Sequence, residues 1–299
     1  MPENFSQKLA EFKTKIINEK ATQASRKSSQ QVLELLTNNL PSLIGGSADL
    51  TESVLTKTSA TKSISKDDFS GRYIHYGVRE HAMGAIMNGL SLHGNFIPYG
   101  GTFLVFSDYL KPALRLSALM HLPIIYVFTH DSIGLGEDGP THQPIEHLAM
   151  LRSIPNVNVF RPADTEETLA CYELALQNKK TPSALILSRQ NLKFVTKDSH
   201  DFDKGAYVVS ESSNPDAVII ATGSELQIAL DSKEILATKN LNIRVISMPC
   251  KEIFDKQQPD YQDKILGRDL NKKLFIAPSK LASSKVGTKL LAMMEFLSA

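Results

Sequence analysis

The stretch Arg72-Tyr-Ile-His-Tyr-Gly-Val-Arg-Glu-His-Ala-Met-Gly-Ala-Ile-Met-Asn-Gly-Leu90 decides how the surrounding chain folds. Its first part predicts an aromatic strand that ends in a tight turn at Gly77, and its second part predicts a helix that opens with Glu80. The residues after Glu80 are small and apolar, so we expect its carboxyl group to be partly buried, where it suits acid–base chemistry. A first-turn glutamate that only complements the helix dipole fits the local pattern equally well.

Strands and helices alternate on both sides of this stretch. The pattern predicts strands at 43–49, 72–76, 95–99, 123–129, 157–161 and 184–188, and helices at 28–40, 79–93, 103–121, 147–153 and 165–177. Strand and helix in turn are typical of an α/β fold, in which a mostly parallel sheet is covered by helices on both faces.

A second, smaller α/β domain is expected after residue 203. A polar segment at 191–203 predicts a linker, and a new series follows with strands at 217–222, 243–248 and 273–277. We therefore place the first domain at 22–190 and the second at 204–299. Residues 1–21 are polar and lysine-rich, which favours a linker-like leader.

Composition excludes several classes of protein. The 299 residues are 42% hydrophobic and 22% charged with a net charge of +1, which is typical of a soluble globular protein. Lys and Arg are scattered, so we expect neither nucleic acid nor a membrane surface as partner. The cysteines, Cys171 and Cys250, have no metal-type spacing, and a reduced, cytoplasmic setting is expected.

A glycine-rich loop follows the expected strand at 123–129. Gly134-Leu-Gly-Glu-Asp-Gly139 matches the G-x-G-x-x-G pattern of dinucleotide-binding folds. Pro140 and Pro144 come where the phosphate-binding helix of such a fold would start, so we reject that interpretation. We expect instead an irregular loop at the carboxyl end of a strand, where open parallel sheets bind ligands.

Three polar residues lie in or beside that loop: His130, Asp138 and His142. They predict a pocket that hydrogen-bonds a hydroxylated substrate and moves its protons. A metal site is the alternative, but no further ligand has the usual spacing, so no metal ligand is assigned. A hydrolase triad built on Ser47 is weaker still, because Gly45-Gly-Ser-Ala-Asp49 lacks the second glycine of a nucleophile elbow.

Three aromatic residues and two arginines would bind a ligand only if the fold brings them to a pocket. Phe103, Phe106 and Tyr109 recur at every third position of a predicted helix, which usually indicates core, although a flat ligand would make the stripe a binding platform. Arg26 and Arg189 lie at the two ends of the first domain. A lone arginine is usually a solvated charge, but two that converge on a pocket would suit a phosphate group.

Taken together, these segments resemble the C-terminal half of the transketolase family, whose members use thiamine diphosphate. The resemblance covers about residues 1–275. The motifs that carry it are Ser25-Arg-Lys-Ser-Ser-Gln30, Gly45-Gly-Ser-Ala-Asp-Leu50, Gly77-Val-Arg-Glu-His-Ala-Met83, Gly100-Gly-Thr-Phe103, Thr129-His-Asp-Ser-Ile-Gly-Leu-Gly-Glu-Asp-Gly-Pro-Thr-His-Gln-Pro144, Leu187-Ser-Arg-Gln190 and Ala221-Thr-Gly-Ser-Glu225.

The resemblance implies roles for the cofactor-binding residues. Glu80 matches the glutamate that hydrogen-bonds a ring nitrogen of the cofactor's aminopyrimidine and favours the tautomer that removes a proton from the thiazolium carbon. Phe106 matches the ring that stacks on the pyrimidine, and Phe103 and Tyr109 lie beside it.

The resemblance also implies roles toward the sugar. His130, Asp138 and His142 match groups that contact its carbonyl and hydroxyls, and the two histidines are the catalytic candidates besides Glu80. The group expected to hold the sugar phosphate consists of Arg26, Ser53 and Arg189.

Two departures from the family shape the expected activity. The N-terminal domain that supplies the diphosphate and divalent-metal site is missing, and Met1-Pro-Glu-Asn-Phe5 resembles the family's interdomain linker. Thiamine diphosphate and Mg²⁺ or Ca²⁺ would therefore be held together with an N-terminal transketolase half or diphosphate-binding subunit, in a homodimer or heterotetramer. After about residue 275 the sequence departs from the family, so a truncated or altered C-terminal domain is expected.

The expected function is that of a transketolase half-enzyme, a transferase of the pentose phosphate pathway. It would transfer a two-carbon ketol unit from a ketose phosphate to an aldose phosphate, given its partner. The alternatives are a 1-deoxyxylulose-phosphate synthase, a component of a 2-oxo acid dehydrogenase, or a catalytically idle fragment.

Overall fold

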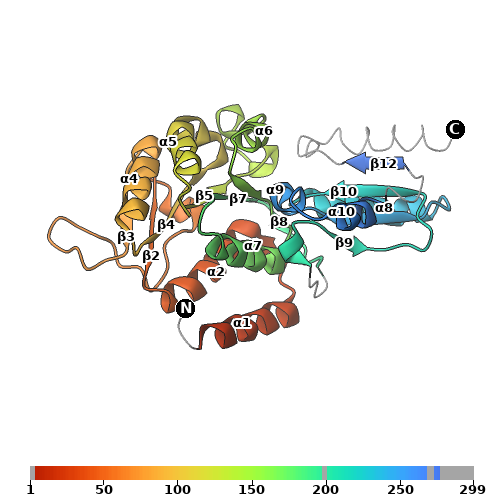
Figure 1. Ribbon diagram of the computed structural model, residues 1–299, viewed down its shortest axis with the longest axis horizontal. Helices are drawn as coiled ribbons and strands as arrows, with labels where there is room; N and C mark the ends of the chain where they lie inside the picture. The colour runs from red at the N-terminus through yellow and green to blue at the C-terminus, as the bar shows by residue number, and fades with distance from the viewer. Residues whose placement is uncertain (1–3, 197–200, 268–272, 277–299) are drawn as a thin grey trace.

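The computed structural model describes residues 4–196, 201–267 and 273–276. Two larger sheets organise them, and they lie beside each other along the long axis of the molecule (Figure 1). The first sheet carries the residues that the sequence singles out, and the second extends from it toward the C-terminal end.

The first sheet has six strands in the order β3-β2-β4-β5-β7-β6, and every neighbouring pair is parallel. Its strands are β2 (Leu43–Ser47), β3 (Tyr73–His75), β4 (Ile97–Phe103), β5 (Ile125–Thr129), β6 (Asn158–Phe160) and β7 (Ser183–Leu187). The chain leaves β2 to one side, toward β3, and returns on its other side as β4, so the strand order reverses there. Open parallel sheets bind ligands at such a point, beyond the carboxyl ends of the strands.

Helices cover both faces of this sheet because successive residues of a strand point to opposite sides. Ile125 and Val127 of β5 pack with the first group of helices, and Tyr126 and Phe128 pack with the second. The first group is α1 (Phe5–Glu19), α2 (Ser25–Asn39) and α7 (Thr165–Gln177); the second is α4 (Glu80–His93), α5 (Ser107–Leu119) and α6 (His147–Arg152). Figure 1 shows the two groups on opposite sides of the sheet. The predicted fold class is confirmed.

The second sheet has four strands in the order β12-β10-β11-β9, and β9 alone runs antiparallel to its neighbour. Its elements are β9 (Tyr207–Ser210), β10 (Ala217–Ala221), β11 (Ile243–Ser247), β12 (Lys273–Ile276), α8 (Glu225–Ala237), α9 (Lys251–Phe254) and α10 (Pro259–Leu266). The smaller α/β unit expected after residue 203 is therefore present, and its sheet is mixed rather than wholly parallel.

The second unit covers the free edge of β6. The Arg161 N–H donates to the Pro249 carbonyl at 2.8 Å, and the Val159 N–H donates to a Glu252 carboxylate oxygen at 3.1 Å. An edge strand left open would present unpaired backbone groups, so these bonds both close the sheet and join the two units.

Two predicted segments differ from the structure. The strand predicted at 95–99 continues through Gly100 and Gly101 to Phe103, so Phe103 ends β4 instead of starting a helix. The glycines allow this because helix and loop side chains pack directly on the strand, and a Cβ at Gly100 would lie 2.5 Å from Met87 Sδ. A short 3₁₀ turn, η1 (Leu104–Phe106), then leads into α5, so the three aromatics do not form one helical stripe.

The polar segments expected to be linkers are partly ordered elements. Most of the leader forms α1, because Phe5 and Ile16 bury themselves against the first group of helices. Within the segment 191–203, β8 (Asn191–Leu192) pairs antiparallel with β1 (Gln23–Ala24). The stretch after residue 276, where an altered tail is expected, lies outside the described residues. Among the described helices, none combines the length and hydrophobicity that a membrane crossing requires.

Candidate functional site

The candidate residues gather at the carboxyl ends of the parallel strands. Asp49 follows β2, Phe103 ends β4, His130 follows β5 and Arg189 follows β7. Glu80 begins α4, shortly after β3 ends. Five separate segments of sequence thus contribute side chains to one edge of the sheet, which is where this architecture binds ligands.

Glu80 sits in a helix start that the local backbone fixes. Gly77 has a φ of +70°, which favours glycine, and the chain turns there out of β3. Arg79 Nη1 donates to the Tyr76 carbonyl at 3.0 Å and holds the turn closed. Glu80 is only 7% exposed, which confirms its predicted burial, and Thr102 Oγ1 donates to its Oε1 at 3.4 Å. The carboxylate therefore keeps most of its hydrogen-bonding capacity for a ligand.

A cavity of about 650 Å³ opens beside this carboxylate. It brings together four of the predicted site residues, Glu80, Phe106, Tyr109 and His142. The remaining lining residues are Ala48, Asp49, Leu50, Val78, Arg79 and His81. The volume lies within the range of small-molecule and cofactor sites, and the lining combines an aromatic wall with a few polar groups.

The aromatic wall continues behind the cavity. Phe103 stacks on Phe106 with ring centroids 5.7 Å apart and planes inclined by 10°. Phe103 also contacts the ring of His130, with centroids 3.8 Å apart. Phe106 meets His142 edge-on at 5.4 Å, and Tyr109 remains 65% exposed. Phe103 thus supports the wall from behind and does not line the cavity itself.

His130 is a buried histidine in an unusual backbone conformation. It is 3% exposed, its φ is +59°, and its Nδ1 lies 2.9 Å from Thr129 Oγ1. Burial lowers the pKa of His130 to about 4, and the positive charge of Arg26 adds to that effect against Asp138. At neutral pH the imidazole is therefore uncharged and can both donate and accept a hydrogen bond.

The predicted phosphate-binding residues converge near His130. Arg26 Nη1 donates to the backbone carbonyl of Ser53 at 2.5 Å, so Ser53 engages the arginine through its main chain. Burial lowers the pKa of Arg26, and repulsion by Arg189 lowers it further, against the attraction of Asp138. Arg189 lies along the glycine loop, where a Cβ at Gly136 would be 3.3 Å from its Nη1. Two guanidinium groups thus lie close enough to repel, which an anion would relieve.

Thr102 and Asp49 are among the residues of the site that were not assigned a role from the sequence. Thr102 hydrogen-bonds Glu80, and Asp49 lines the cavity with a φ of +62°. Thr102 lies in Gly100-Gly-Thr-Phe103 near the end of β4, and Asp49 lies in Gly45-Gly-Ser-Ala-Asp-Leu50 two residues after β2. A search for polar residues at strand ends would have found them.

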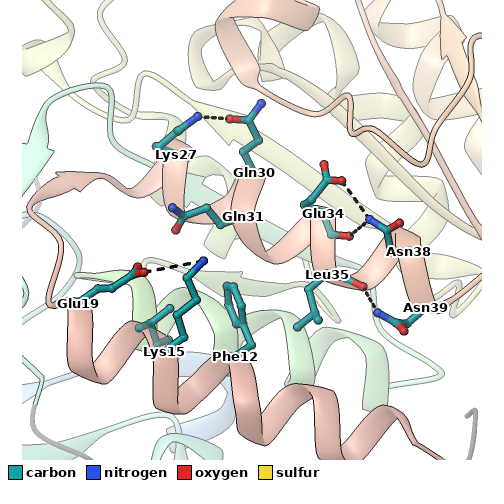
Figure 2. A pocket seen from close by; sticks show the side chains of 11 residues that line it. Phe12, Lys15, Glu19, Lys27, Gln30, Gln31, Glu34, Leu35, Asn38 and Asn39 are labelled. Carbon is teal, nitrogen blue, oxygen red and sulfur yellow. Dashed lines mark hydrogen bonds and ion pairs between the residues drawn. The ribbon is translucent and has the colours of Figure 1, made fainter.

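A second hollow lies apart from this site, between α1 and α2, with a volume of about 570 Å³ (Figure 2). Its polar side chains are largely satisfied by each other: Lys27 donates to Gln30 at 2.6 Å, and Asn38 donates to Glu34 at 3.0 Å. None of the predicted site residues lines it. Within the part of the chain that the structure describes, no group of three or more His, Cys, Asp or Glu is arranged to hold a metal ion.

Comparison with known proteins identifies the family. Residues 21–195 match the transketolase pyrimidine-binding domain, and residues 205–293 match the transketolase-like C-terminal domain. A transketolase from Sinorhizobium medicae is 56% identical over 264 residues, which are 87% of this chain and 38% of that protein. The chain thus spans well under half the length of this curated relative.

Solved structures agree. A transketolase from Pichia stipitis in complex with sedoheptulose-7-phosphate superposes with a TM-score of 0.81 at 42% identity, covering 92% of this chain and 44% of that one. A chain of a split-gene transketolase, described as an inactive beta4 tetramer, has a TM-score of 0.67 over 86% of this chain and 89% of that one. At 24% identity the second likeness shows the fold alone. The domain matches and the sequence identity together show that this chain belongs to the transketolase family.

Proposed function

We propose that this chain is the pyrimidine-binding half of a transketolase. Together with a diphosphate-binding partner it would transfer a two-carbon ketol unit from a ketose phosphate to an aldose phosphate. The observation that carries this proposal is the buried Glu80 carboxylate on a cavity of about 650 Å³ whose wall includes Phe106.

The residues present fit the aminopyrimidine of thiamine diphosphate. A flat heteroaromatic ring matches the face of Phe106, and a ring nitrogen within reach of Glu80 would find a carboxylate with one long hydrogen bond from Thr102. When bound, thiamine diphosphate supplies the carbon nucleophile for the ketose carbonyl. Glu80 would hold and share the proton at that nitrogen, in a pocket that Phe106 and Tyr109 line.

The sugar would extend from the cavity past His142 toward His130. His142 borders the cavity, and His130 lies behind Phe103 as an uncharged imidazole that can donate to or accept from a hydroxyl. Asp138, on the glycine loop, would accept from a further hydroxyl. Arg26, held on the Ser53 carbonyl, and Arg189 would share the phosphate group. The sedoheptulose-7-phosphate bound by the Pichia stipitis relative belongs to this substrate class.

A partner chain completes the proposal. The chain covers 38% of the Sinorhizobium relative, and the described residues offer no carboxylate cluster for a divalent metal. We propose that an N-terminal transketolase half holds the diphosphate and Mg²⁺ or Ca²⁺, and that this chain forms a homodimer or, with that half, a heterotetramer. The apolar side chains on the outer sides of α4 and α5 supply a surface for that assembly; Ile86, Leu92, Leu116 and Leu119 are 45–66% exposed.

Two further parts of the proposal concern domains and compartment. We place the pyrimidine-binding domain at 22–190 and the C-terminal domain from 204 onward, joined across the β6 edge. A cytoplasmic location is proposed because Cys171 and Cys250 are both buried free thiols, which favours a reducing setting.

The test is reconstitution of the chain with an N-terminal transketolase half, thiamine diphosphate and magnesium. Xylulose 5-phosphate as donor and an aldose phosphate as acceptor should give ketol transfer that neither chain gives alone. Transfer from pyruvate but not from xylulose 5-phosphate would point to the other thiamine enzymes instead. A complex that forms without any turnover would identify an idle fragment.

A further inference from the structure

A second buried polar cluster lies where the C-terminal unit meets the loop that carries His130. Its centre is Arg161, just after β6, which is fully buried. Arg161 Nη2 lies 3.2 Å from Asp131 Oδ2, and its Nη1 lies 2.8 Å from Glu225 Oε2. The same Nη1 donates to the Thr222 carbonyl at 3.1 Å. One guanidinium therefore joins the end of β6 to two other segments, the loop at Asp131 and the turn at 222–225.

The position of these residues in the chain gives the cluster its interest. Asp131 directly follows His130, whereas Glu225 is the first residue of α8 in the C-terminal unit. Gly223, with a φ of +60°, allows the close approach, because a Cβ there would lie 3.3 Å from Arg161 Cζ. The cluster thus runs from the second sheet to the backbone of the proposed sugar-binding loop.

The cluster is held by charge. Burial opposes the charge on Arg161, yet Glu225 and Asp131 together raise its pKa above the ordinary value. Among the described residues, Asp131 Oδ1, Glu225 Oε1 and Arg161 Nε have no hydrogen-bond partner. The ion pairs therefore have little redundancy, and the loss of one changes the balance of the others.

His130 needs such an anchor. Its φ of +59° is a backbone conformation that residues other than glycine rarely adopt, and it persists only where neighbouring contacts stabilise it. Phe103 and Thr129 contact the ring of His130, and the next residue, Asp131, pairs with the buried Arg161.

We propose that Glu225 and Arg161 are positioning residues that hold His130 in its site geometry through Asp131. The C-terminal unit would then set the shape of the sugar-binding loop without contacting the sugar. The role of His130 toward the sugar rests on the proposed function; the positioning itself does not.

The test compares two glutamates of the C-terminal unit, each of which contacts a residue of the first unit. Glu225→Gln removes the negative charge that pairs with Arg161. The matched Glu252→Gln removes a negative charge that accepts from the Val159 N–H and pairs with Arg152. Hydrogen exchange of residues 130–135 is measured on the full chain, without cofactor, sugar or partner. We expect Glu225→Gln to speed exchange there about tenfold, relative to the exchange of the rest of the sheet, and Glu252→Gln to leave it unchanged.

Gly223→Ala supplies the second variant, because it displaces Arg161 and leaves both carboxylates in place. It should also speed exchange at 130–135 and shift the NMR resonance of the His130 ring, assigned by its loss in His130→Gln. The proposal requires both Glu225→Gln and Gly223→Ala to act. If either leaves the loop unchanged, or if Glu252→Gln affects it equally, the C-terminal unit stabilises the fold without positioning His130.

Activity measurements distinguish a failure of the positioning proposal from a failure of the proposed function. In the reconstituted enzyme, Glu225→Gln should raise the KM for the ketose phosphate, and Glu252→Gln should not. If the unmodified chain shows no ketol transfer at all, the proposed function fails while the exchange result still decides the positioning.

Discussion

Two helices of this molecule, α4 and α8, both begin with a buried glutamate, but the two carboxylates have different surroundings. α4 opens with Glu80 and α8 opens with Glu225, and both glutamates are buried, at 7% and 1% exposure. Glu225 faces the guanidinium of Arg161 at 2.8 Å. Glu80 receives one hydrogen bond, from Thr102 at 3.4 Å, and borders a cavity.

The difference teaches that burial of a first-turn carboxylate does not identify its task; its neighbours do. A carboxylate neutralised by a buried cation is committed to the fold, because separating the pair would leave a charge without compensation. A carboxylate beside a cavity keeps its lone pairs for a ligand. Glu80 should therefore matter for activity, and the Glu225 cluster for stability and loop geometry.

The largest expected effect is on catalysis. Glu80→Gln should lower ketol transfer in the reconstituted enzyme by up to about ten-thousandfold, because the amide cannot share the proton. The matched control is Asp260→Asn, which changes an exposed first-turn carboxylate of α10. Steady-state rates and melting curves are measured together. Rates close to wild type in Glu80→Gln would remove Glu80 from its proposed role, and a large loss of stability would make it structural like Glu225.

The converse is expected at the other helix start. Arg161→Met should lower the free energy of unfolding by about 3–5 kcal/mol, because it leaves Asp131 and Glu225 buried without their cation. Lys15→Met is the control, since Lys15 pairs with Glu19 at 3.8 Å on the exposed side of α1 and should cost less than about 1 kcal/mol. Urea unfolding of the full chain provides the measurement. Equal losses in the two variants would show that burial of the Arg161 cluster adds nothing.

A smaller effect would sharpen the assignment of the ligand side. Arg189→Ala should raise the KM for a ketose phosphate by about 10- to 100-fold, because a charge-assisted bond to phosphate is lost. An unphosphorylated ketose serves as the internal control and should keep its KM. If both donors lose affinity alike, Arg189 supports the loop and does not bind the phosphate.

The smallest effect concerns pH. The folded-state pKa of His130, about 4, lies below its ordinary value of about 6.5, so the unfolded chain binds more protons between these values. Stability contributed by the neutral imidazole is therefore complete above about pH 6.5 and is lost as the pH falls toward 4. By pH 5 the wild type should lose about 1–2 kcal/mol more than His130→Gln, as measured by urea unfolding at each pH. Parallel pH profiles would contradict the lowered pKa.

Much of the fold was predictable because hydrophobic patterns are local. The helix predicted at 165–177 is α7, and the strand predicted at 123–129 contains β5. The predicted end of one strand was wrong because glycines, which have a low strand propensity, continue β4 at Gly100 and Gly101. The leader was predicted as a linker, but the burial of a few apolar residues orders it as α1. Propensity alone does not report such packing.

The sequence predicted which residues form the site better than it predicted how they are arranged in space. The motifs named Glu80, Phe106 and His142, which line one cavity, but placed Phe103 on a helix with the other aromatics. Nothing in the sequence paired Arg161 with Asp131 and Glu225, since these residues are far apart in the chain and each belongs to a different element.

The sequence by itself determined the alternation of strand and helix, the place of Glu80 at a helix start and the motifs of the family, because each depends on residues that are neighbours along the chain. Only the tertiary structure decided which strand ends meet, how Phe103 stacks on the wall of the cavity, and that Glu225 of α8 meets Arg161 beside the loop that carries His130. Such contacts depend on the order of strands in the sheet, and strand order is a property of the packed chain that local patterns do not encode.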